Sequence, residues 1–270
     1  MIFKKEHLLL QKAVRKFAEE EVLPYAAERE KEGAISRNLM EKLARYKYTS
    51  PIVPKEYGGA GADYTSYVII MEAISKKCAS TGTFTTAAAS LVSSPLLNFG
   101  TEEQKQKYLT RITSGEAIGA FGLTEPGAGS DAGGQTTTAV LDGDSYILNG
   151  RKTFITNAPI ADFAIVIAVT ERGKGVKGTS AFIVDMNLEG VSCGAHEDKM
   201  GIRATETSDL IFENVRVPKE NILGKEGQGF KIAMHTLDTG RIGVAAQALG
   251  VAQGAMDEAV KYSKERVQFG

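Results

Sequence analysis

The spacing of apolar residues divides the chain into a helical first part, a strand-rich middle and a helical end. In residues 1–116, apolar positions recur with the period of a helix, as in the segment His7–Glu32. Asp63 can cap the helix that follows it, and Thr101-Glu102-Glu103-Gln104 has the form of a capping box. We therefore predict an N-terminal helical domain over residues 1–116.

At Ala117 the pattern changes to short apolar runs separated by glycine-rich turns. Six runs are predicted to be strands: Ile118–Leu123, Thr136–Leu141, Ser145–Leu148, Ala164–Val169, Ala181–Val184 and Leu210–Phe212. Asn149-Gly150 is predicted to be a hairpin turn leading into a further strand-like run, Thr153–Ile155. Because no helical segment separates the runs, they indicate an antiparallel β domain over residues 117–225.

A long helical pattern returns in residues 226–270, so the whole chain is predicted to be α+β. The pattern contains glycines, and each costs a helix roughly 1 kcal/mol relative to alanine. For Gly243, Gly250 and Gly254, close packing against another helix is the best interpretation. Gly240 has a different interpretation, which is given below.

Composition excludes several classes of protein. A net charge of −1 argues against nucleic acid or an anionic membrane as the main partner. Cys78 and Cys193 lie far apart and the three histidines are scattered, so we expect no disulfide framework and no metal site. No apolar run approaches the roughly 18 residues of a membrane span, and the N-terminus has no signal-peptide pattern. The expected compartment is the cytoplasm.

Two polar motifs carry candidate chemistry. The loop Gly122–Asp131 contains Gly127 and Gly129, which let the backbone approach a ligand closely, and the hydroxyls of Thr124 and Ser130. By itself this loop is equally consistent with an ordinary surface turn, and it lacks the spacing of a dinucleotide fingerprint. The second motif, Asn149–Asn157, brings an aromatic ring and a hydroxyl to the end of a strand.

With three further motifs, these two resemble the acyl-CoA dehydrogenase flavoprotein family in order along the whole chain. The three are Met200-Gly201-Ile202-Arg203, Asp238-Thr239-Gly240-Arg241 and Arg266-Val267-Gln268-Phe269-Gly270. The chain is most similar to short-chain, butyryl-CoA dehydrogenase-like members from anaerobic bacteria. The resemblance implies an acyl-CoA dehydrogenase-like fold, in which residues 226–270 are the first helix of a C-terminal helical domain whose remainder is absent.

The resemblance also implies a FAD site and an acyl-CoA site. The residues implied for FAD are Phe121, Leu123, Thr124, Ser130, Phe154, Ile155, Thr156, Arg266 and Phe269. Those implied for substrate are Ser130, Asp238, Thr239, Gly240 and Arg241. Arg266 would contact the FAD pyrophosphate of a neighbouring subunit, because a guanidinium suits that group. From spacing alone, Asp238 and Arg241 are more simply a surface ion pair.

Many relatives carry Tyr at position 121 and Trp at position 154, where this chain has phenylalanine, so a polar group is lost at each. Arg203 also matches the family, and we interpret it as a residue that pairs the domains.

The resemblance places the catalytic base outside the sequence. Removal of the substrate α proton needs a carboxylate. In one branch of the family this glutamate occupies the position of Gly240, which excludes that placement here. In the larger branch it lies in the C-terminal helical domain, so the base is expected beyond Gly270. Glu125 and Asp131 are interpreted as carboxylates that shape their loop.

The implied function is FAD-dependent α,β-dehydrogenation of a short acyl-CoA thioester, or reduction of the matching enoyl-CoA. Electrons would be exchanged with an electron-transferring flavoprotein, and the enzyme would be a homotetramer. Two alternatives remain open at this point. One is an acyl-CoA oxidase or flavin monooxygenase on the same fold, and the other is a non-catalytic scaffold that binds flavin or acyl-CoA.

Overall fold

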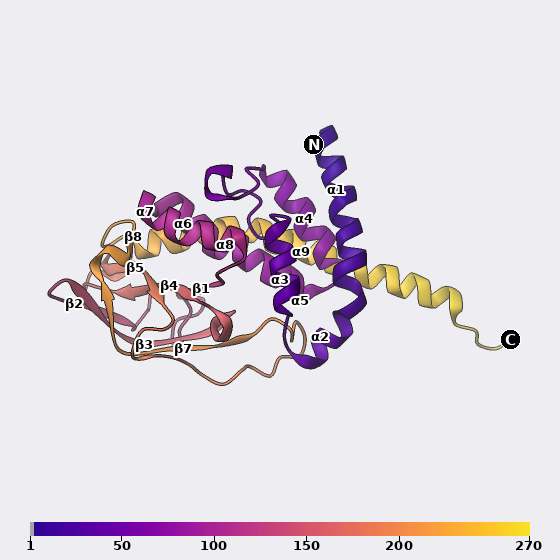
Figure 1. The fold of residues 1–270 in the computed structure, drawn as a ribbon. Helices are drawn as coiled ribbons and strands as arrows, with labels where there is room; N and C mark the ends of the chain where they lie inside the picture. The colour runs from indigo at the N-terminus through magenta and orange to yellow at the C-terminus, as the bar shows by residue number, and fades with distance from the viewer. Residues whose placement is uncertain (1–2) are drawn as a thin grey trace.

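The computed structural model describes residues 3–270, and its first part is a bundle of helices (Figure 1). The helices are α1 (Lys5–Phe17), α2 (Ala26–Glu32), α3 (Arg37–Arg45), α4 (Tyr64–Ser75), α5 (Ala79–Thr86), α6 (Ser93–Phe99), α7 (Glu102–Gln104) and α8 (Thr110–Ser114). Both predicted caps are confirmed. The Asp63 carboxylate accepts a hydrogen bond from the Ser66 amide at 2.9 Å, and Thr101 and Gln104 form the capping box.

Short π-helical segments join several of these helices. Ala18–Val22 continues α1, Ala87–Val92 links α5 to α6, and Lys105–Leu109 links α7 to α8. The predicted helix from His7 to Glu32 is therefore nearly continuous, but it passes through a π-helical turn and a 3₁₀ turn at Leu23–Tyr25. Pro24 lies in that 3₁₀ turn, because proline cannot donate a hydrogen bond inside a regular helix.

The middle of the chain forms one mixed sheet (Figure 1). Its strands are β1 (Gly119–Gly122), β2 (Thr138–Asp142), β3 (Ser145–Thr156), β4 (Phe163–Val169), β5 (Thr179–Asp185), β6 (Val191–Cys193), β7 (Thr207–Pro218) and β8 (Ile222–Leu223). The order is β6-β7-β3-β2-β4-β5-β8, with β1 also paired to β4. The pairing is antiparallel, as predicted, except that β4 is parallel to β1 and, at one residue pair, to β2.

The predicted hairpin turn at Asn149-Gly150 is wrong. Both residues lie inside β3, which runs without interruption to Thr156. The Asn149 side chain accepts a hydrogen bond from the Asn214 amide of β7 at 2.8 Å, and the pairing with β7 is irregular there. Gly150 has a φ of 149°, and a Cβ atom would overlap Thr137. Asn-Gly therefore marks a β-bulge, and the turn between β2 and β3 lies at Gly143 instead.

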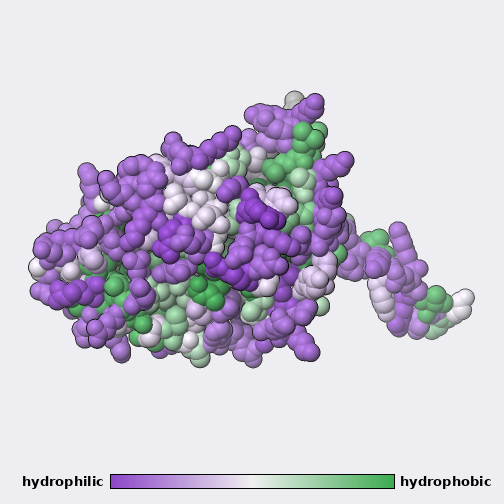
Figure 2. All heavy atoms as spheres, in the orientation of Figure 1, coloured by the Kyte–Doolittle hydropathy of each residue, from purple (hydrophilic) through white to green (hydrophobic). Residues whose placement is uncertain are grey.

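Helix α9 (Gly229–Glu265) starts against β5, runs along α4 and then projects away from the body of the molecule (Figure 1). A Cβ atom on Gly243 would overlap the Tyr67 hydroxyl, and one on Gly254 would overlap the Lys76 carbonyl oxygen. Close helix packing is therefore confirmed as the role of these glycines. Hydrophobic atoms lie exposed among polar ones on the projecting end (Figure 2). Those exposed on α9 are Ile242, Val244, Leu249, Val251, Met256, Val260 and Tyr262.

Strand β4 lies at the centre of the core. Phe163, Ile165 and Ile167 pack with residues of the helices, whereas Ala164, Val166 and Ala168 pack on the opposite face of the sheet. Both faces of β4 are therefore buried, which explains its unbroken apolar sequence. Among residues 3–270, no helix has both the length and the apolar character needed to cross a membrane.

Candidate functional site

A cleft of about 160 Å³ lies where the ends of β1 and β3 meet helix α9 and the π-helical segment Ala87–Val92. It is lined by Ala87, Leu91, Val92, Gly119, Ala120, Phe121, Leu123, Thr124, Phe154, Ile155, Thr156 and Leu237. Six of these are predicted FAD residues: Phe121, Leu123, Thr124, Phe154, Ile155 and Thr156. The lining combines aliphatic groups, two aromatic rings and two threonine hydroxyls, and includes no ionisable side chain among the described residues.

Phe154 reaches this cleft through a strained backbone conformation. Its φ is 58°, in the left-handed region, and the pairing of β3 with β7 is irregular between Lys152 and Ile155. The residue is 64% exposed, so burial of the ring does not offset this strain. Strain of this kind persists only where neighbouring contacts impose it, and it gathers at functional sites.

One contact that holds this bulge comes from β7. Asp209 is buried, and its carboxylate accepts a hydrogen bond from Arg151 Nε at 2.6 Å. Burial by itself would raise the pKa of Asp209, but hydrogen bonds from Thr153, Arg151 and the Phe154 backbone lower this pKa overall. The charged carboxylate therefore anchors the residues on both sides of Lys152.

A second contact is made by Lys152 of β3, whose side chain is fully buried. Its ammonium donates to Glu125 Oε1 at 2.7 Å, to Gln135 Oε1 at 2.9 Å and to the Leu123 carbonyl oxygen at 3.2 Å. These three acceptors match the three protons of an ammonium group. Burial lowers the pKa of Lys152 to about 8, although the Glu125 carboxylate opposes this shift.

Glu125, the partner of Lys152, is also fixed by several hydrogen bonds. Its carboxylate also accepts hydrogen bonds from the Thr136 amide and hydroxyl, both at 2.7 Å, and from the Thr137 amide at 3.0 Å. Burial would raise the pKa of Glu125, but the Lys152 ammonium and these donors lower it to about 2. A carboxylate so occupied is not available as a base, and the interpretation of Glu125 as a loop-shaping residue is confirmed.

The predicted substrate residues fall into separate places. Asp238 and Arg241 are exposed on α9 and form an ion pair with each other. Thr239 is buried, with its hydroxyl 3.3 Å from Ser94 Oγ. Gly240 lies beside the cleft residue Leu91.

The remaining predicted residues lie outside the cleft. Ser130 is exposed and does not line it. Arg266 and Phe269 follow the end of α9, where Arg266 Nη1 donates to the Tyr262 hydroxyl at 2.8 Å and Phe269 is exposed. This chain by itself does not bring these two residues to the cleft, so their contact with a neighbouring subunit's FAD stays a prediction.

The interpretation of Arg203 needs a correction in detail. Its backbone amide donates to Glu30 of α2 at 2.8 Å and so links the two domains. Its guanidinium instead pairs at 2.6 Å with Asp198, which belongs to the same part of the chain. The link between domains therefore comes from the backbone, because the side chain is already used locally.

Sequence reasoning gave no role to two residues that support the site, Lys152 and Asp209. The available signal for Lys152 was its period-2 spacing from Tyr146 and Leu148, which also face inward. A charged residue between Arg151 and Thr153 is nevertheless typical of a solvent-facing strand position. Asp209 had no local signal, because its partners come from another strand.

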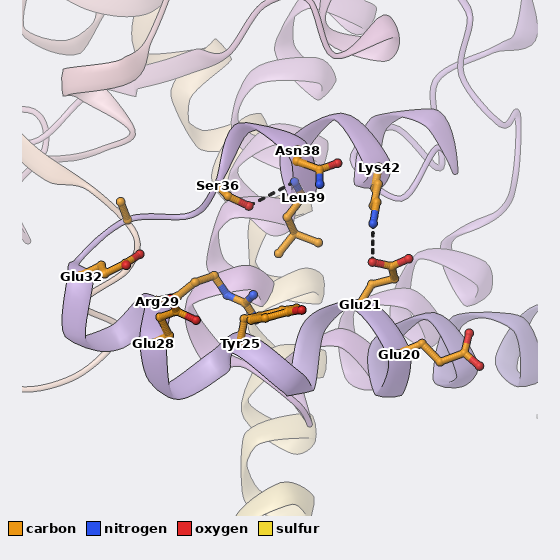
Figure 3. Close-up of a pocket in the computed structure, with 11 residues that line it drawn as sticks. Glu20, Glu21, Tyr25, Glu28, Arg29, Glu32, Ser36, Asn38, Leu39 and Lys42 are labelled. Atoms are coloured by element: carbon orange, nitrogen blue, oxygen red, sulfur yellow. Dashed lines mark hydrogen bonds and ion pairs between the residues drawn. The ribbon is translucent and has the colours of Figure 1, made fainter.

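A larger hollow, of about 500 Å³, lies on the N-terminal helices (Figure 3). Figure 3 shows its charged side chains, among them Lys42, which pairs with Glu21 at 2.5 Å. The buried Arg29 donates to the Val22 carbonyl oxygen and so ties α2 to the π-helical segment before it. None of the predicted site residues line this hollow, and its contacts serve the packing of α1, α2 and α3.

The fold combines a helical bundle, a mixed sheet and the long helix α9 around an apolar cleft. This is an acyl-CoA dehydrogenase-type fold, and three family models match the chain. The acyl-CoA dehydrogenase N-terminal domain matches residues 4–116, the middle domain residues 120–215 and the C-terminal domain residues 227–270. The chain belongs to the acyl-CoA dehydrogenase family, a family of flavin-dependent oxidoreductases.

Individual relatives agree with this assignment. The chain is 52% identical to the short-chain-specific acyl-CoA dehydrogenase of Clostridium acetobutylicum, over 98% of this chain and 70% of that protein. It is 54% identical to the 3-(aryl)acrylate reductase of Clostridium sporogenes, over 100% of this chain and 71% of that protein. A chain in the solved structure described as the electron transferring flavoprotein of Acidaminococcus fermentans superposes with a TM-score of 0.97 at 51% identity, covering 100% of this chain and 71% of that one.

Proposed function

We propose that this protein binds FAD non-covalently, with the flavin ring in the cleft between β1, β3 and α9. The observation that carries the proposal is the lining of that cleft, where the rings of Phe121 and Phe154 lie with aliphatic side chains and the hydroxyls of Thr124 and Thr156. A flat ring system with a polar edge needs this combination. When bound, the flavin supplies hydride transfer, and the protein supplies binding, orientation and electrostatics.

The proposed reaction is α,β-dehydrogenation of a short acyl-CoA thioester, or reduction of the matching enoyl-CoA. The relatives support both directions, since one is named a short-chain-specific dehydrogenase and another an arylacrylate reductase. We assign Asp238 and Arg241 to the thioester arm of the substrate, because both are exposed on α9 close to the cleft residue Leu237. The proposed redox partner is an electron-transferring flavoprotein, which the described neighbour structure supports.

Removal of the α proton requires a carboxylate, and the cleft lining includes none among the described residues. Glu125 is occupied by Lys152 and by the backbone amides of Thr136 and Thr137. We therefore propose that the catalytic carboxylate is contributed from outside residues 3–270. Arg266 and Phe269 are proposed to reach the FAD of a neighbouring subunit in a homotetramer, since both are exposed beyond the body of this chain.

The test is a visible absorption spectrum of the purified protein after incubation with FAD and removal of free FAD. We expect flavin absorbance to remain with the protein. In the complete enzyme, butyryl-CoA should bleach that absorbance anaerobically, and admission of air should restore it slowly. A protein that retains no flavin would contradict the proposal, and rapid reoxidation by air would favour an oxidase instead.

A further inference from the structure

We propose that Lys152 is a positioning residue that joins the two flavin-facing segments, residues 121–124 and 154–156, into one rigid wall of the cleft. This inference rests on the proposed function, because it assigns a role toward the flavin cleft. Lys152 itself does not line the cleft. It acts through the backbone and side chains of the residues that do.

The first segment is held by the Lys152 ammonium. One proton goes to the carbonyl oxygen of Leu123, a cleft residue, at 3.2 Å. A Cβ atom on Gly122 would lie 3.3 Å from Lys152 Cγ, so the lysine stem packs directly under the end of β1. The ammonium thus fixes the direction of the Leu123 carbonyl, and with it the backbone that leads to Thr124.

The same ammonium holds both ends of the following loop. Glu125 at its start and Gln135 at its end each accept one proton, at 2.7 and 2.9 Å. Glu125 in turn accepts from the amides of Thr136 and Thr137. Between these ends Gly127, Gly129 and Ser130 are exposed, and a Cβ atom on either glycine would meet no neighbouring atom, whereas Ala128 is buried. The position of this loop therefore depends on the buried network.

The second segment is attached to Lys152 by the chain itself. Phe154 follows two residues later, inside the bulge that gives it a positive φ. Thr153, which lies between Lys152 and Phe154, donates its amide to the Thr124 carbonyl oxygen at 2.8 Å. Together, the hydrogen bonds of the Lys152 ammonium and the Thr153 amide fix the distance between the loop that follows β1 and the bulge in β3. A ring between Phe121 and Phe154 needs this separation to be constant.

Positioning and stability can be separated experimentally at this pair. Removing only one partner would leave a buried, uncompensated charge, which is strongly destabilising, whereas replacing both with neutral groups of similar size is often tolerated. The test variant is therefore the double substitution Lys152→Met with Glu125→Gln. Its matched control is Arg216→Met with Asp142→Asn, an exposed pair at 2.5 Å that joins β7 to β2.

The measurements are the FAD dissociation constant, the reduction potential of the bound flavin and the thermal unfolding temperature of the FAD-free protein. For the Lys152/Glu125 variant we expect the FAD dissociation constant to rise at least about tenfold, because the hydrogen bonds that hold the Leu123 and Thr124 side of the cleft are lost. The reduction potential should shift, because the Leu123 and Thr124 backbone changes its orientation. For the Arg216/Asp142 control, the FAD dissociation constant should differ from that of wild type by less than about twofold.

A Lys152/Glu125 variant that folds and binds FAD as tightly as wild type, with an unchanged potential, would overturn the role of Lys152 and leave the proposed function intact. A wild-type protein that binds no FAD would overturn both. If the double variant does not fold, the variant Gln135→Leu tests the inference in its place. This substitution removes one hydrogen-bond acceptor of the Lys152 ammonium and keeps the ion pair between Lys152 and Glu125. A rise of about threefold or more in the dissociation constant would then support the inference, and an unchanged value would overturn it.

Discussion

Gly250 of helix α9 and Glu72 of helix α4 meet backbone to backbone: a Cβ atom on Gly250 would overlap the Glu72 carbonyl oxygen. A backbone carbonyl cannot move aside without disturbing its own helix. Gly240, ten residues earlier on α9, has more room, since a Cβ atom there would lie 3.4 Å from the flexible Leu91 side chain. Helix α9 therefore has no room for a side chain at Gly250, but it has room for one at Gly240.

We expect Gly250→Ala to destabilise the protein by about 1–3 kcal/mol, because overpacking outweighs the better helix propensity of alanine. Gly240→Ala is the matched control, and it should be neutral or stabilise by up to about 1 kcal/mol. Urea unfolding of both variants beside wild type provides the comparison. Equal effects of the two substitutions would contradict the assignment of Gly250 to helix packing.

Acid should destabilise the protein through Glu125. The pKa of Glu125 is about 2 in the folded protein, against 4.5 for a free glutamate. Because the folded pKa is the lower one, the stabilisation is complete above about pH 5 and is lost as the pH falls toward 2. The loss should be about 2–3 kcal/mol in the free energy of unfolding. Unfolding curves between about pH 5 and pH 2.5 should show it.

The double variant Lys152→Met with Glu125→Gln is the reference for this titration. It should lose less stability over the same pH range, because its residue 125 does not titrate. Identical slopes in wild type and variant would show that other carboxylates account for the acid sensitivity. Asp63, whose pKa is also about 2, titrates equally in both proteins and so cancels in the comparison.

Phe154→Gly should separate folding from function. Glycine adopts a positive φ without strain but loses more conformational freedom on folding, so we expect stability within about 1 kcal/mol of wild type. FAD affinity should fall strongly, because one aromatic wall of the cleft is gone. Phe154→Leu retains bulk and backbone strain, and its FAD affinity should be intermediate. Fluorescence titration with FAD measures this order, and wild-type affinity in Phe154→Gly would contradict it.

Arg241→Ala should raise the Michaelis constant for acyl-CoA more than it lowers turnover. Its guanidinium is exposed and pairs only with Asp238 among the described residues, so its loss costs little stability. In the proposed role it orients the thioester arm and does not act in the transition state. Steady-state kinetics of the complete enzyme with butyryl-CoA separate the two constants. A defect confined to turnover would show that Arg241 has another role.

Features set by neighbours in the sequence could be predicted from it. The caps at Asp63 and Thr101 depend on contacts three residues away, and the change of pattern at Ala117 depends on periodicity over a few residues. The six cleft residues near Thr124 and Phe154 were named in another way, through the resemblance of their two motifs to a known family. The caps and the change of pattern needed no knowledge of the fold, because they depend on residues close together in the sequence.

Only the tertiary structure decided what each polar residue does. Asn149-Gly150 has the composition of a turn, but pairing with Asn214 of β7 makes it a bulge within a strand. Lys152 looks like a solvent-facing strand residue, yet the loop from Glu125 to Gln135 folds over it and buries it. The physical reason is that burial, cross-strand register and the pKa of a buried pair depend on partners distant in the sequence, and only the folded chain brings those partners together.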